Sequence, residues 1–580
     1  LRGDVDAIDG TWDVLVSQGK AKLDLLLQGY ASLEAVRTLF THAPNWGHGF
    51  FAQGNGAAPG NGFSGGVATC DSGMPVWRRH DEVTSDCLEA IYRDLNHQSE
   101  MDQKFFEANM QGHLVDLPAG EARFSVGVHS RENSYYYNFD PLQTSDHFLD
   151  NPMGFAASST IGATSVDEVY GEMLVPLLQG VPAIRHLNLE LGYRYSDYEF
   201  QGGVDTYKAL IDWGITDTLR FRGGRQIATR APNIAEMFQA ETLSWTFSGT
   251  GDPCGLNSNA TYGANAAVNP NYQQAIDICS ARMGAIAAEY YTGQQPNGSV
   301  WTPFSNATGN PSVGVEEAET YTAGFVWSPT EIDLTATIDW YSIEVQDMIS
   351  IEPATLVYEK CLSASSNPTG DPMHPDCLRI NRNPGSGGAA PTTASYINAA
   401  FARVKGVDLT VDWRRDMLGG NFGVNFIVTS LQEVKTQASD ASPILEWKGS
   451  LGPGPGTSLN NGSYDYRTFT NFSYGRNDWT LSLRWRHLPS AIDGTAVETP
   501  ASTELGAEES YDVFDLTGTW AANDSLVLRF GVENLFDEPP VWTGGRTALD
   551  NSPSTGSGTT EAGFYDILGR QYFVGIQASF

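Results

Sequence analysis

The stretch FEANMQGHL at residues 106–114 alternates apolar or small residues with polar ones at every second position. After a turn at 116–121 the alternation resumes in ARFSVGVH at 122–129. A period of two places the two kinds of side chain on opposite faces of a β-strand. The two segments therefore predict neighbouring strands that share one apolar and one polar face.

The same period of two returns along the rest of the chain. It is present at 187–195, 334–340, 407–413, 481–485 and 572–580. Alternation alone is also typical of soluble antiparallel sheets with one solvated face. The connections between the strands therefore have to distinguish the two possibilities.

Short and long connections alternate. Short turns are predicted at Asp116–Glu121, Gly214–Thr218, Ser328–Glu331, Arg415–Asn421, Gly475–Asp478 and Ala521–Asp524. Long segments rich in Gly, Asn, Ser and Pro are predicted at 21–100, 138–168, 229–315, 349–397, 437–463, 488–508 and 537–563. Trp residues stand near the predicted strand ends, at Trp213, Trp327, Trp413, Trp479 and Trp520. Short turns at one end, long loops at the other and aromatic residues at strand ends are typical of outer-membrane proteins, so we predict an all-β, transmembrane antiparallel β-barrel.

The composition agrees with this class. The 580 residues carry 34 Lys and Arg against 69 Asp and Glu, a formal charge of -35 at pH 7. This acidity argues against a nucleic-acid partner, whose phosphates require a basic surface. No run reaches the roughly 18 apolar residues of a membrane-spanning helix. In a barrel, the membrane surface is instead spread over every second residue of many strands.

Several segments resemble motifs of the TonB-dependent outer-membrane receptor family. Residues 223–238 (GGRQIATRAPNIAEMF) resemble its "RAPN…ELF" segment, and residues 532–537 (VENLFD) look like its "NLFD" motif. Residues 565–573 (YDILGRQYF) are similar to its closing strand. Residues 319–324 and 339–343 fit strands from the middle of that barrel. These motifs occur in family order across residues 200–580.

The resemblance implies a domain organisation. Family members have a 22-strand barrel preceded by a plug domain and a TonB box. Counting backward from Phe580 gives about 17 strands, strands about 6 to 22 of the family barrel. We therefore expect residues 1–580 to be β-barrel domain, with the plug domain and the TonB box absent from this sequence.

The resemblance also implies a function. It is the TonB-dependent active uptake of a scarce or bulky ligand across the bacterial outer membrane, where the protein is a multi-pass β-barrel. The ligand is a siderophore, a corrinoid or an oligosaccharide. The TonB–ExbB–ExbD complex is expected to act through the N-terminal region. Further expected partners are outer-membrane lipid, lipopolysaccharide and the barrel assembly machinery, and neither a cofactor nor enzyme activity is expected.

Two alternatives remain open at this stage. The first is a passive outer-membrane channel, which needs neither plug nor TonB. The second is a surface glycan-processing enzyme, which needs a pair of catalytic carboxylates. The sequence singles out no such pair.

The six Cys fall into three local pairs in predicted loops: Cys70 with Cys87, Cys254 with Cys279 and Cys361 with Cys377. A protein exported through the oxidising periplasm is expected to form disulfides at these pairs. Free buried thiols are the alternative, and a metal site is disfavoured because no Cys-x-x-Cys occurs. Residues 85–95 and 272–290, each with one of these Cys, are predicted to be loop helices, with a ligand lid as the alternative.

Other candidate residues follow from the barrel prediction. Those on the polar faces of strands are expected to line the lumen: Glu107, Asn109, His113, Arg123, His129, Glu190, Arg194, Arg220 and Arg222. Loop Trp residues are candidates for stacking on a ligand: Trp46, Trp77, Trp245, Trp301 and Trp542. Tyr572 and the terminal Phe580 resemble the assembly signal of outer-membrane proteins. The alternatives are solvation of the barrel interior and pairing with the plug for the polar-face residues, and ordinary loop packing for the Trp residues. A terminal Phe can also occur in any sheet protein.

Overall fold

Seventeen strands follow one another in hydrogen-bonded antiparallel pairs in the computed structural model of the chain. The structure describes residues 1–32, 35, 84–144, 148–149, 158–245, 251–292, 304–437, 443–451, 463–498, 506–507, 509–542, 560 and 564–579. The strands are β1 Arg2–Val5, β2 Gly10–Ser32, β3 Tyr92–Leu117, β4 Gly120–Asn138, β6 Thr160–Val181, β7 Ile184–Tyr198, β8 Gly202–Gly214, β9 Leu219–Arg230, β12 Glu316–Trp327, β13 Asp333–Ile351, β14 Thr392–Met417, β15 Gly420–Gln437, β18 Tyr466–Arg476, β19 Trp479–Leu488, β21 Tyr511–Asn523, β22 Leu526–Glu533 and β23 Gln571–Ala578. The predicted all-β antiparallel fold is confirmed, and these seventeen strands of the described residues agree with the predicted number of about 17.

The strand register separates a polar face from an apolar face. On β3, β4 and β6 the polar row runs from Glu107 to His129 to Glu168. The neighbouring row runs from Ala108 to Val128 to Val169. Residues opposite one another on adjacent strands share a face, so each row continues from strand to strand. We call the two sides the polar face and the apolar face.

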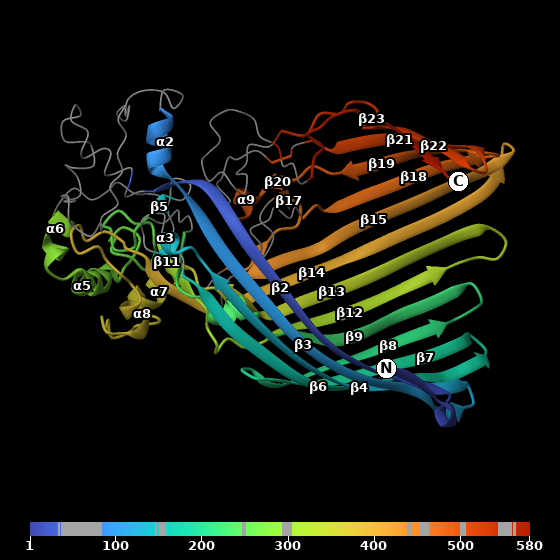
Figure 1. Cartoon of the computed structure of the whole chain (residues 1–580), viewed down its shortest axis with the longest axis horizontal. Coiled ribbons are helices and arrows are strands. Elements are labelled where there is room, and N and C mark those ends of the chain that lie inside the picture. The colour runs from blue at the N-terminus through green and yellow to red at the C-terminus, as the bar shows by residue number, and fades with distance from the viewer. Residues whose placement is uncertain are drawn as a thin grey trace.

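The connections gather by length at the two ends of the sheet (Figure 1). Two-residue turns join β3 to β4, β6 to β7, β14 to β15, β18 to β19 and β21 to β22 at one end. Helices and long connections occupy the opposite end, at the left of the figure. One connection departs from the prediction, because β7 and β8 join through the short turn 199–201 at the loop end.

Some predicted loops are shorter than expected because their strands continue. The 21–100 loop was too long at both sides, since β2 runs to Ser32 and β3 begins at Tyr92. In this region Lys20 lies opposite Asp102 and Lys22 lies opposite Glu100. These charged pairs interrupt the alternation of apolar and polar residues, but the hydrogen bonds between the two strands continue. The 138–168 and 349–397 loops are shortened in the same way by β6 and β14.

The loop helices also differ from the prediction. The helix expected at 85–95 is α2 Ser85–Ile91, because residues 92–95 already pair with β2. The helix expected at 272–290 is α5 Tyr272–Met283, η3 Gly284–Ile286 and α6 Ala287–Thr292. Gly284 breaks it with a φ of 67°, a left-handed conformation that glycine adopts without steric cost.

Short elements complete the described part of the chain. They are η1 Asp6–Ile8, α3 Pro141–Thr144, β5 Phe148–Leu149, α4 Ile234–Phe238, β10 Thr242–Trp245, β11 Phe304–Thr308, α7 Ala354–Leu362, α8 Pro375–Leu378, β16 Leu445–Glu446, β17 Ser450–Leu451, β20 Ile492–Asp493 and α9 Gly494–Glu498. None of the described helices is long and apolar enough to cross a membrane. The two clusters of buried apolar side chains centre on these connections.

Candidate functional site

The segment Arg230–Phe238 connects the end of β9 to α4 and is held by an ion-pair network. Asn233 and Glu236 form a reciprocal capping box at the start of α4. The Arg230 guanidinium contacts the Glu236 carboxylate at 2.9 Å and the Glu316 carboxylate of β12 at 2.6 Å. Both carboxylates are largely buried, so the pairing satisfies charges that burial would otherwise destabilise. This motif therefore has a structural role at the loop end of the sheet.

Helix α4 lies against the polar face of β6 at Gly162. A Cβ at Gly162 would stand 2.4 Å from the Phe238 ring and 2.9 Å from the Ile234 side chain. Glycine is therefore required for this close approach. The contact fixes α4 over the polar face and leaves a cavity beside it.

This cavity, which we call the α4 pocket, has a volume of about 620 Å³. Its lining comes from β3, β4, β6, the end of β7 with the β7–β8 turn, and the segment from β9 through α4: Met101, Arg131, Asn133, Tyr135, Thr164, Ser165, Val166, Tyr198, Phe200, Gln201, Thr229, Arg230, Ala231, Pro232, Asn233, Ile234, Ala235 and Met237. The volume falls in the range of small-molecule sites. None of these lining residues is a carboxylate, although the chain as a whole carries a charge of -35.

Arg131 is the cation of the α4 pocket that has no ion pair among the described residues. Its neighbours across the strands are Phe105 on β3 and Val166 on β6, and neither can pair with a guanidinium. Its Nε is buried without a hydrogen-bond partner among the described residues. Arg131 is not among the residues predicted from the sequence, although it continues the polar alternation of Ser125 and His129.

The polar-face residues predicted from sequence have partners on the protein itself. Glu107 accepts a hydrogen bond from the Tyr170 hydroxyl at 2.9 Å, and Asn109 also contacts that hydroxyl. Glu168 contacts His129 Nδ1 at 2.5 Å and Arg194 Nη1 at 3.0 Å. The others pair as follows: His113 with Asp116, Arg123 with Glu121 and Asp9, Glu190 with Lys208, Arg220 with Asp212 and Arg222 with Asp339. Their role along a transport path stays a prediction.

Two other cavities have acidic linings. One, of about 630 Å³, includes Glu190, Asp212, Asp339 and Asp408 with two arginines. The other, also about 630 Å³, includes Asp205, Glu317 and Glu319 with one arginine. The α4 pocket is therefore distinguished from both by its lack of carboxylates.

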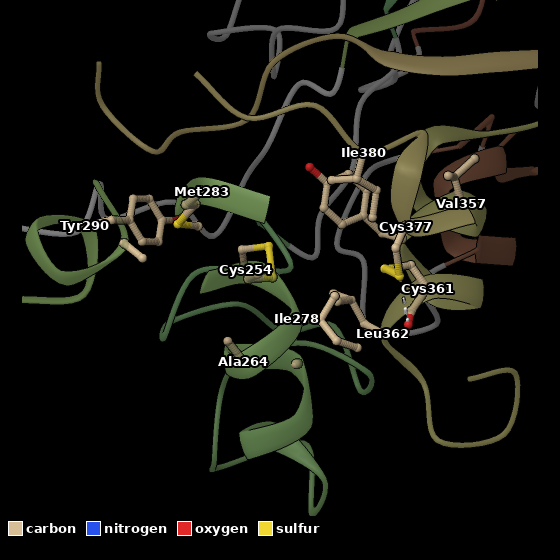
Figure 2. Close-up of a cluster of buried hydrophobic side chains, with 14 residues drawn as sticks. Cys254, Ala264, Ile278, Met283, Tyr290, Val357, Cys361, Leu362, Cys377 and Ile380 are labelled. Atoms are coloured by element: carbon tan, nitrogen blue, oxygen red, sulfur yellow. Dashed lines mark hydrogen bonds between the residues drawn. A yellow bond between two sulfur atoms is a disulfide. The ribbon is translucent and has the colours of Figure 1, made fainter. Parts of the chain in front are cut away.

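The β9–β12 and β13–β14 connections fold together into what we call the loop unit, residues 251–292 and 352–391. Disulfides Cys254–Cys279 and Cys361–Cys377 staple each connection internally, as predicted. Figure 2 shows Ile278 and Leu362 between the two disulfides, within one buried apolar cluster. The two connections thus share a core although neither disulfide joins them.

A buried ion pair crosses this core. The Arg382 guanidinium, 1% exposed, contacts the Asp252 carboxylate at 2.7 Å and the Tyr358 hydroxyl at 3.1 Å. Burial raises the pKa of Tyr358 to about 12, so the hydroxyl is neutral at physiological pH. Burial likewise raises the pKa of Glu359. On the sheet side, the buried Glu352 carboxylate contacts Lys360 at 2.7 Å and Arg379 at 2.5 Å.

The remaining predicted site residues are dispersed. Cys87 is disulfide-bonded, and its predicted partner Cys70 lies outside the described residues. Trp46, Trp77, Trp301 and Phe580 also lie outside them. Trp245 is part of β10, and Trp542 is 68% exposed after β22. Tyr572, 72% exposed, lies on the apolar face of β23 opposite Val532.

The two C-terminal motifs form hydrogen bonds at the start and the end of the connection between β22 and β23. Asn534, fully buried, donates its backbone N–H to Asp515 at 3.0 Å and exchanges hydrogen bonds with Glu538. The Asp537 carboxylate accepts the backbone N–H of Arg570 at 2.9 Å. Residues 532–537 and 565–573 therefore stabilise the approach from β22 to β23.

Comparisons with known proteins agree with this architecture. The ferric enterobactin receptor PfeA of Pseudomonas aeruginosa, solved as a mutant with enterobactin, is 14% identical with a TM-score of 0.51, over 84% of this chain. The siderophore receptor PirA of Acinetobacter baumannii is 14% identical over 84% of this chain and 59% of its own, with a TM-score of 0.47. The Serratia marcescens hemophore receptor HasR, solved with HasA and heme, is 12% identical over 84% of this chain and 62% of its own, with a TM-score of 0.42.

The likeness to PfeA concerns the fold, and this chain spans 59% of the length of that receptor chain. A search among curated proteins gives no match. The sequence profile described as TonB dependent receptor-like, beta-barrel, matches residues 22–535. This chain therefore belongs to the TonB-dependent receptor family as a β-barrel portion of it.

Proposed function

We propose that the protein to which this chain belongs takes up a scarce or bulky ligand across the bacterial outer membrane, driven by TonB. The observation that carries the proposal is the antiparallel run of seventeen strands with one polar and one apolar face in a member of this family. The family and its fold are those of receptors and transporters, not of enzymes.

The two faces support a location in the membrane. On the apolar face, Val16 is 73% exposed, Val574 80% and Ile576 71%, an arrangement that stabilises a protein only next to lipid or another apolar surface. Each of these residues lies on a strand that pairs with a neighbour in the sheet, β2 with β3 and β23 with β22. We infer that the apolar face contacts lipid and the polar face lines the lumen.

The loop end of the sheet supports ligand capture. The loop unit and the α4 pocket both lie at that end, away from the two-residue turns. In outer-membrane barrels the long loops are extracellular. The ligand thus arrives at this end, and the candidates are a siderophore, a corrinoid or an oligosaccharide. The structures of similar fold have enterobactin, or heme with its hemophore, as ligands.

Energy is expected to come from the TonB–ExbB–ExbD complex acting on a plug domain in the N-terminal region. Outer-membrane lipid, lipopolysaccharide and the barrel assembly machinery are the other proposed partners. These partners are proposed for the whole protein, because this chain spans only 59% of the length of the PfeA chain.

Uptake in the producing bacterium tests the proposal. Strains with and without the gene are compared for uptake of ⁵⁵Fe bound to a tricatecholate chelator, ⁵⁵Fe citrate, cobalamin and maltohexaose, each with TonB intact and inactivated. Uptake of one of these that needs both the gene and TonB supports the proposal. Uptake that needs the gene but continues without TonB contradicts it and establishes the passive channel instead, and gene-independent uptake of all four also contradicts it.

A further inference from the structure

The α4 pocket combines an aromatic wall with a half-buried cation that has no ion pair among the described residues. Arg131 lies between the apolar neighbours Phe105 and Val166, with no ion pair among the described residues. A guanidinium in this position has lost part of its hydration without gaining a protein anion in exchange. An anion from outside the chain would compensate the guanidinium for the hydration that it has lost.

Asn133 adds a second donor beside Arg131. The two residues are two positions apart on β4, so they share the polar face. The Asn133 carbonyl oxygen accepts a hydrogen bond from Gln103 Nε2 at 2.8 Å, which leaves the NH₂ group available as a donor. A guanidinium and an amide NH₂ side by side match the oxygens of a carboxylate, phenolate or phosphate.

The other cation of the pocket is already neutralised. Arg230 forms ion pairs with Glu236 and Glu316. Its charge is therefore neutralised within the protein, and its role is to hold the segment that leads into α4. Glu168, two positions along β6 from Val166, is occupied by His129, Arg194 and the Ser196 hydroxyl. Arg131 therefore determines that a ligand group bound in the pocket would carry a negative charge.

Aromatic side chains define the rest of the ligand. Tyr135, Tyr198 and Phe200 line the pocket, and Tyr135 stacks on Tyr137 with ring centroids 6.3 Å apart. Such a wall favours a planar, apolar or aromatic body next to the anionic group. The volume of about 620 Å³ accommodates a small molecule or one arm of a larger one.

We propose that the α4 pocket is a subsite for an anionic oxygen group carried next to an aromatic or apolar body, and that Arg131 is its binding residue. The proposal deepens the proposed function, on which it rests, because it assigns an anionic ligand class to the receptor. A neutral oligosaccharide does not fit this subsite.

Binding to the full-length receptor in detergent tests the assignment. The probes are a ferric tricatecholate, ferric citrate and neutral maltohexaose, titrated calorimetrically against wild type, Arg131→Met, Arg131→Lys and the control Arg185→Met. Arg185 is 65% exposed, pairs with Asp217 and lies next to the turn between β6 and β7, so its variant loses the same charge at the other end of the sheet. Unfolding temperatures of all variants show that each is folded.

We expect wild type to bind at least one anionic probe and Arg131→Met to weaken that binding roughly 10- to 100-fold, the effect of losing a charged hydrogen bond. Arg131→Lys should retain an intermediate affinity, and Arg185→Met should bind like wild type. Equal affinity of wild type and Arg131→Met, binding of maltohexaose alone, or binding of no probe overturns the inference. Arg131-dependent binding without TonB-dependent uptake overturns the proposed function instead and leaves the subsite standing.

Discussion

The Arg382 guanidinium lies 2.7 Å from the Asp252 carboxylate and thereby joins two connections that leave the sheet at different strands. Asp252 belongs to the β9–β12 connection and Arg382 to the β13–β14 connection. Each disulfide closes within one connection, so the two connections are joined instead by this ion pair, by the surrounding apolar cluster and by hydrogen bonds such as that from Arg282 to the Ile380 carbonyl.

Removing one partner of this pair should loosen the loop unit strongly. Asp252→Asn leaves the buried Arg382 without its counter-ion, which we expect to cost about 3 kcal/mol of local stability. Hydrogen exchange of residues 251–292 and 352–391 measures the loss. The double variant Asp252→Asn/Arg382→Met should cost less than the sum of the single variants. As a control, Lys448→Met removes the exposed partner of Asp465 and should cost less than about 1 kcal/mol. Additive costs would show that the pair is not coupled.

The two disulfides should contribute unequally. The Cys254–Cys279 bridge spans 25 residues and the Cys361–Cys377 bridge 16. The loop-entropy relation then gives about 3.5 and 3.1 kcal/mol for the two bridges. Replacing each pair by Ala should increase proteolysis within the loop unit, more for Cys254/Cys279, while the sheet keeps its unfolding temperature. An unchanged rate of proteolysis in both variants would contradict a stabilising role.

The loop unit should lose stability as pH rises through the raised pKa of Glu359. Burial raises the pKa of this carboxyl from its usual value of 4.5, so the folded unit binds the proton more tightly than the unfolded chain does. The favourable contribution is complete below pH 4.5 and disappears as pH rises through the higher folded pKa. Glu359→Gln should therefore gain stability relative to wild type over that window, as measured by thermal unfolding at pH 4 to 8. If the stability gain of Glu359→Gln over wild type became smaller as pH rises, the prediction would be contradicted.

A charge on the apolar face should impair assembly, whereas the same charge on the polar face should not. Val126 lies on the apolar face opposite Met110, and the adjacent Ser125 lies on the polar face opposite Gln111. Val126→Arg should cost about 2 to 4 kcal/mol if the residue lies near the middle of the bilayer. Urea unfolding in lipid vesicles compares it with the control Ser125→Arg. Equal stability of the two variants would mean that this face is not in lipid.

The alternation of residue types was enough to predict much of the fold. Apolar and polar residues at every second position determine which face each side chain takes, and strand pairing then aligns these faces. The local pairs Cys254/Cys279 and Cys361/Cys377 were also predictable, because both partners lie within one connection. The ends of β2 and β3 were not, because there the backbone ladder continues through charged pairs that lack the alternation.

The chemistry of the α4 pocket was decided only by tertiary structure. Sequence places Arg131 and Arg194 on the same polar face and cannot distinguish them. In the folded sheet Arg194 meets Glu168, whereas Arg131 meets Phe105 and Val166. Whether a charge is neutralised depends on cross-strand neighbours from distant parts of the chain. The sequence by itself therefore determined the two faces of the sheet, and the pairing of its strands determined which of the two arginines lies beside a carboxylate.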